Sequence, residues 1–67
     1  MHIRVNGEEV VFAENQVTVT ELLQRFSLAG RPVMVERNRE IVLKPQYGET
    51  LLADGDVVEI VQFVGGG

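Results

Sequence analysis

Cysteine and tryptophan are absent from the sequence, and histidine occurs once, as His2. Without cysteine the chain can form neither a disulfide nor a thiolate metal site. A single histidine provides no metal-ligand set, and no Ser/His/Asp arrangement can be assembled around it. We therefore expect no catalytic residue and no metal site in this chain, and we expect its stability to come from core packing.

Basic residues are also scarce, with six Lys and Arg against ten Asp and Glu and a net charge of −4. They are spread along the chain, whereas nucleic-acid binding needs a clustered basic face. The mild negative charge favours approach to a basic partner surface. No apolar run approaches the ~20 residues of a membrane span, and Arg4 and the Asn6-Gly7 pair interrupt any signal peptide. These absences predict a cytoplasmic protein with no nucleic-acid or membrane partner.

The chain has 67 residues, of which 45% are hydrophobic, and this is enough for one small domain with a single core. A core of this size leaves little room for a substrate pocket with several converging polar groups. The small core therefore argues against an ordinary enzyme.

The first half of the chain predicts a hairpin followed by a helix. Asn6-Gly7 separates two β-rich segments and is typical of a type I′ turn, in which both central residues need φ > 0. Thr18 and Glu21 form the pattern of a capping box. The predicted helix has nine to eleven residues, and Gly30 acts as its stop a little after the last turn. Its apolar stripe consists of Leu22, Leu23 and Phe26.

The second half predicts three more strands, at residues 33–36, 41–43 and 57–64. Between them lie an Asn38-Arg39 turn, an irregular segment at residues 45–50 with one turn of 3₁₀ helix, and an Asp54-Gly55-Asp56 turn. If the first and last strands pair in parallel, the order matches the β-grasp (ubiquitin-like) arrangement. We expect an α+β fold, with a mixed sheet of four to five strands and one main helix packed on one face.

Three glycines, Gly65-Gly66-Gly67, follow the last strand. Glycine has no Cβ and moves freely through φ/ψ space, so this segment predicts a thin, flexible tail that ends in a carboxylate and can enter a narrow slot. The alternative is an ordinary frayed end. We expect residues 1–64 to form the domain and residues 65–67 to form the tail.

Several motifs together resemble one family, the thiamine-pathway sulfur carrier proteins (ThiS) of the β-grasp superfamily. They are residues 35–38 (Val-Glu-Arg-Asn), Ile41-Val42, Pro45 with Tyr47, residues 52–61 around the Asp-Gly-Asp turn, and Val64 with the three glycines. The resemblance covers essentially the whole chain. Two positions depart from the family pattern, because Tyr47 stands where tryptophan is frequent and Gly65 varies among members.

The resemblance implies a carrier cycle on the terminal residue. A ThiF-like adenylating enzyme would use ATP to activate the carboxylate of Gly67, and a cysteine persulfide donor would then convert it to a thiocarboxylate. A ThiG-like thiazole synthase would receive the sulfur for thiamine biosynthesis. By this resemblance Gly65 and Gly66 provide access, the chain itself binds no cofactor, and it acts as a carrier and not as an enzyme.

Strand alternation predicts the docking surface of such a carrier. Val58 and Ile60 should face the core, which leaves Val57, Val61 and Phe63 on the opposite side of the last strand. We expect these three residues, with Val64, to contact partner proteins. The alternative is that Phe63 folds back over the sheet edge.

Three other functions remain compatible with the sequence. The small subunit of molybdopterin synthase shares the fold and the thiocarboxylate chemistry, although residues 62–64 lack the prolines that tend to precede the glycines in that family. A ubiquitin-like modifier shares the adenylation step, and a plain β-grasp binding domain would make no use of the tail. We expect the chain to be a monomer when it is alone.

Overall fold

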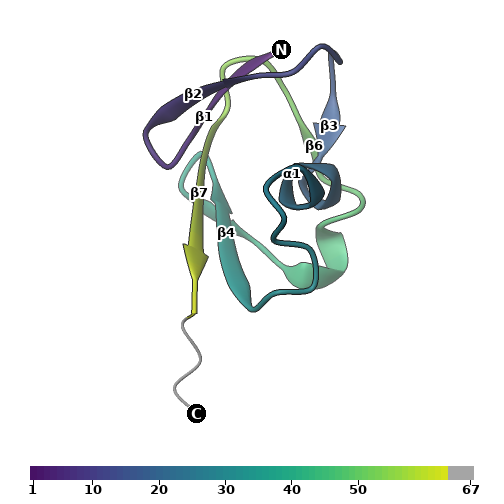
Figure 1. Ribbon diagram of the computed structural model, residues 1–67, viewed down its shortest axis with the longest axis vertical. Helices are drawn as coiled ribbons and strands as arrows, with labels where there is room; N and C mark the ends of the chain where they lie inside the picture. Colours follow the sequence, from purple (N-terminus) through teal and green to yellow (C-terminus); the bar gives the residue numbers. More distant parts are fainter. Residues whose placement is uncertain (64–67) are drawn as a thin grey trace.

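The computed structural model describes residues 1–63 and contains a five-stranded mixed sheet, a short two-stranded sheet, one α-helix and one 3₁₀ helix (Figure 1). Val64 and the three glycines, and with them the predicted tail, lie outside the described residues. The large sheet has the order β2 (Glu8–Val11), β1 (His2–Val5), β7 (Val57–Gln62), β4 (Val33–Arg37) and β5 (Glu40–Val42). The predicted β-grasp fold is confirmed.

The two strands at the centre of the sheet connect the start of the chain to its end. β1 and β7 pair in parallel through Arg4 with Val57 and Val5 with Val58, as predicted. All other pairs of the sheet are antiparallel. Asn6 and Gly7 have φ of 50° and 84°, so the predicted type I′ turn joins β1 to β2.

The helix α1 (Val19–Arg25) begins as predicted, because Thr18 and Glu21 form the capping box. It has seven residues, so the predicted length of nine to eleven residues was wrong. Ser27 adopts φ of 59° just after the helix, and the Leu28 N–H donates to the Leu23 carbonyl at 2.7 Å. This hydrogen bond is the 6→1 bond of a Schellman motif, so Ser27 fills the left-handed position that the sequence assigned to glycine.

A second sheet was not predicted. β3 (Val17–Thr18) pairs antiparallel with β6 (Leu51–Leu52) on the helix side of the large sheet. The 3₁₀ helix η1 (Lys44–Gln46) precedes β6 and lies at the start of the segment where one turn was expected. Two-residue strands are too short to give a periodic pattern, so only their long-range pairing reveals them.

The core lies between the large sheet and α1. Leu22 and Leu23 of the helix belong to the same buried cluster as Val35, Val58 and Ile60 of the sheet, whereas the third predicted stripe residue, Phe26, is 37% exposed. No helix within residues 1–63 is long and apolar enough to span a bilayer. The arrangement buries one face of the sheet and leaves the other face open.

Candidate functional site

The face of the large sheet turned away from α1, here called the open face, carries the predicted docking residues. Val57 and Val61 are each 45% exposed and Phe63 is 56% exposed, whereas Val58 and Ile60 are buried. The predicted alternation is therefore confirmed for Val57, Val58, Ile60 and Val61, and Phe63 is outside the core. Whether these residues contact a partner stays a prediction.

Neighbouring strands extend this apolar surface. Met34 of β4 pairs with Val61, and Ile41 of β5 pairs with Glu36 on the same side. Met34 is partly buried and Ile41 is 59% exposed. Exposed or partly exposed apolar side chains from three strands thus occupy one face, and contiguous patches of this kind often mark interaction surfaces.

Two carboxylates lie within the open face. Glu36 of β4 and Glu59 of β7 are directly opposite each other in the antiparallel ladder. Like charges in this position destabilise a sheet by a few tenths of a kcal/mol. Because the ion pair found within residues 1–63 is Arg37–Asp56, neither carboxylate has a cation within salt-bridge distance there. The open face therefore carries two carboxylates among its apolar groups, and Arg39 lines the same hollow as both of them.

The last described residues hold β7 against β4 up to the end of the sheet. Val33 pairs with Gln62, and the Phe63 N–H donates to the Pro32 carbonyl at 3.0 Å. In Figure 1 this end of β7 lies at the opposite end of the molecule from the N-terminus. The predicted modified residue Gly67, the access residues Gly65 and Gly66, and the docking residue Val64 come after it and are outside the described part of the chain.

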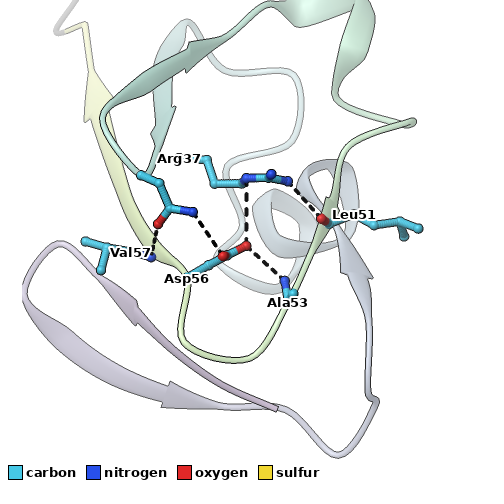
Figure 2. Close-up of polar contacts among 6 residues, drawn as sticks. Arg37, Leu51, Ala53, Asp56 and Val57 are labelled. Atoms are coloured by element: carbon cyan, nitrogen blue, oxygen red, sulfur yellow. Dashed lines mark hydrogen bonds and ion pairs between the residues drawn. The ribbon is translucent and has the colours of Figure 1, made fainter.

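The Asp-Gly-Asp turn before β7 is held by a polar cluster (Figure 2). Asp56 accepts hydrogen bonds from the Ala53 N–H at 2.9 Å and from the Asn38 side chain at 3.1 Å, and it lies 3.8 Å from the Arg37 guanidinium. Arg37 also donates to the Leu51 carbonyl at 2.9 Å. These contacts fix the start of β7 relative to the β4–β5 turn.

Arg37 and Asn38 connect two turns that are distant in sequence. The residues are those of the Val-Glu-Arg-Asn and Asp-Gly-Asp motifs, so both motifs have a structural role here. Asp54 has a similar role, because its carboxylate accepts a 2.6 Å hydrogen bond from the His2 N–H.

Within the part of the chain that the structure describes, no three His, Cys, Asp or Glu side chains gather so as to hold a metal ion. The reactive group that the sequence predicts is at the terminus, outside the described residues, and the docking role of the open face stays a prediction.

Comparisons with known proteins give the same family at the levels of sequence and structure. The model of the ThiS family matches residues 3–67. The sulfur carrier protein ThiS of Bacillus subtilis is 45% identical over 65 residues, which cover 97% of this chain and 98% of that protein. The crystal structure of the thiamine biosynthesis protein ThiS from Geobacter metallireducens superimposes with a TM-score of 0.85, at 38% identity and with complete coverage of both chains.

A third relative has a different size. A thiazole synthase of Paramagnetospirillum magneticum is 46% identical over all 67 residues of this chain, which spans only 20% of the length of that protein. Full-length agreement with the first two relatives, together with the β-grasp sheet and its open face, establishes that this chain belongs to the ThiS family, the sulfur carrier proteins of thiamine biosynthesis.

Proposed function

We propose that this chain carries sulfur as a thiocarboxylate on Gly67 and passes it on for formation of the thiazole ring of thiamine. The observation that supports this most directly is the exposed apolar group of Val57, Val61 and Phe63, which leads along one strand to the point where the tail begins. A partner that docks on this group is in position to receive the glycines. Glycine has no side chain next to the reacting carbon, so a narrow slot that excludes water can close around it.

The chemistry requires access and no acid or base from the carrier. A free α-carboxylate is an anion at neutral pH, and its oxygen attacks the α-phosphorus of ATP to give an acyl-adenylate and pyrophosphate. The sulfur of a cysteine persulfide then displaces AMP, and cleavage of the resulting acyl disulfide by a thiol leaves the thiocarboxylate. The chain itself binds no cofactor in this proposal, because the adenylating enzyme binds the ATP.

The adenylating enzyme is the first partner in this proposal, and its docking surface should be apolar with basic residues. The exposed apolar residues of the open face would contact the apolar part of that surface. The opposed carboxylates of Glu36 and Glu59 would contact its basic residues. Thiazole synthase is the second partner. This assignment is supported by the thiazole synthase relative that contains a segment similar to the whole chain. We place this cycle in the cytoplasm, with the chain as a monomer.

Intact-mass spectrometry tests the proposal. The full chain is incubated with a ThiF-like adenylating enzyme, ATP and a persulfide donor, and its mass should rise by the difference between one sulfur and one oxygen atom. A chain that lacks Gly67 is the control and should remain unchanged. A lysine-linked adduct of the chain would indicate a ubiquitin-like modifier instead, and no ATP-dependent change would reject the carrier role.

A further inference from the structure

Strand β7 continues beyond the strand that flanks it on one side. β1 pairs with β7 only up to Val5 and Val58, and the chain then turns away at Asn6 into β2. On its other side β7 stays paired with β4 as far as Gln62. Figure 1 shows the lower half of β7 running past the β1–β2 hairpin with only β4 beside it.

Asn6 closes the pairing between β1 and β7. Its backbone N–H donates to the Val58 carbonyl at 2.9 Å. Its side chain then occupies the place of the next strand residue, because Oδ1 accepts from the Ile60 N–H at 2.7 Å and Nδ2 donates to the Ile60 carbonyl at 3.1 Å. Both backbone groups of Ile60 that point toward β1 are therefore satisfied, and the pairing on this side ends there.

The next residue with the same orientation is Gln62. Backbone groups alternate between the two edges of a strand, so Gln62 directs its N–H and carbonyl to the same side as Val58 and Ile60. Phe63 confirms the alternation, because its N–H points the opposite way, to Pro32 of the segment before β4. Within residues 1–63 no strand lies beside Gln62 on the β1 side. We call the backbone N–H and carbonyl of Gln62 on this side the free edge of β7.

We propose that the free edge of β7 accepts an extended backbone segment of the adenylating enzyme by strand addition, which aligns the tail as it enters that enzyme. This inference rests on the proposed function and deepens it. An unpaired donor and acceptor along a strand edge are the groups that strand addition uses. Val61 and Phe63 lie next to this edge on the open face, so a segment paired there would also meet apolar side chains.

Proline at position 62 tests the inference with little effect on the fold. Gln62→Pro removes an N–H that the described fold does not use, and proline is tolerated at edge positions whose N–H faces solvent. The matched control is Gln62→Ala, which removes the same side chain and keeps the N–H. Both variants should melt close to the unaltered chain.

The readout is ATP–pyrophosphate exchange by the adenylating enzyme at limiting carrier concentration. We expect kcat/KM to fall about tenfold or more for Gln62→Pro, because one hydrogen bond is lost and the ring blocks the approach of the partner strand. Gln62→Ala should stay within about twofold, since every backbone group is retained. Equal exchange by Gln62→Pro and the unaltered chain would leave the carrier role standing and overturn strand addition. No exchange by the unaltered chain would reject both.

Amide hydrogen exchange of the unaltered chain gives a second test that needs no variant. The Gln62 amide should exchange rapidly in the free chain and should be protected when the chain is saturated with the adenylating enzyme. An unchanged rate in the complex, or protection by thiazole synthase alone, would overturn the inference. Sedimentation of the free chain tests whether a second copy of this chain occupies the free edge. A dimer that dissociates in the Gln62→Pro variant would assign the free edge to that second copy.

Discussion

The side-chain amide of Asn38 donates a 3.1 Å hydrogen bond to the carboxylate of Asp56, which joins the β4–β5 turn to the turn that precedes β7. The same Asn38 accepts from the Val57 N–H at 2.9 Å and donates its own N–H to the Val57 carbonyl at 2.7 Å. These hydrogen bonds fix the start of β7 relative to the β4–β5 turn. The position of its other end depends on this start and on the pairing with β4.

Replacing Asp56 should destabilise the fold more than replacing its neighbour in the same turn. Asp56→Ala removes two hydrogen bonds and one ion pair, and we expect a loss of about 1–3 kcal/mol in the free energy of unfolding. Asp54→Ala removes only the hydrogen bond to His2 and should cost about 1 kcal/mol. Urea denaturation of both variants measures the difference. Equal losses of unfolding free energy in the two variants would mean that the contacts of Asp56 with Arg37 and Asn38 add no stability beyond that of the turn itself.

The local signals of this sequence predicted most of the fold. Asn6-Gly7 specified the hairpin turn through its φ requirement, and Thr18 with Glu21 specified the helix start through hydrogen bonds three residues apart. The alternation of Val58 and Ile60 with their neighbours separated the core from the open face. Each of these features depends on residues close together in the chain, so each can be inferred without coordinates.

The features that were missed depend on contacts between distant residues. The Asn6 side chain reaches Ile60, and Asn38 reaches Asp56, and neither residue type indicates such a partner in advance. The early helix end at Arg25 was missed because Ser27, and not a glycine, takes the left-handed conformation. The predicted reactive residue Gly67 lies outside the described residues, so its role rests on the sequence and on the family.

Arg39 is a site where the fold can be made more stable. It has φ of 70° in the Asn38-Arg39 turn, a conformation that is costly for a residue with a Cβ and free for glycine. We expect Arg39→Gly to raise the free energy of unfolding by about 0.5 kcal/mol, since the greater flexibility of unfolded glycine offsets part of the gain. Arg39→Val should lower it, because β-branched residues fit this region poorly. A less stable glycine variant would show that the arginine side chain makes a compensating contact.

Glu59 should show opposite effects on stability and on binding. Glu59→Lys replaces a repulsive cross-strand pair with an attractive one opposite Glu36, so the free energy of unfolding should rise by about 0.2–1 kcal/mol. The same change should weaken binding to the adenylating enzyme, because it places a cation where we expect a basic partner surface. Glu14→Lys, with the same charge change in an exposed loop, is the control. Isothermal titration at low salt measures binding, and unchanged affinity for the Glu59 variant would remove the carboxylates from the docking surface.

Phe63 is the most exposed of the three described docking residues, which makes it the sharpest test of the open face. Phe63→Asp should change the free energy of unfolding by only about 0.5 kcal/mol, because the side chain is 56% exposed. Exposed aromatic side chains at interfaces often contribute a large share of the binding energy. We therefore expect the affinity for the adenylating enzyme to fall about tenfold or more, which corresponds to about 1.4 kcal/mol.

Val11→Asp is the matched control for Phe63→Asp. Val11 is 52% exposed on β2, at the edge of the sheet and away from the end of β7, so its replacement should leave binding unchanged. Equal weakening by both variants would indicate a general effect of added negative charge. A large fall in melting temperature for Phe63→Asp alone would instead place Phe63 among the residues that hold β7 to β4. In that case the docking surface would have to be sought among Val57, Val61 and Ile41.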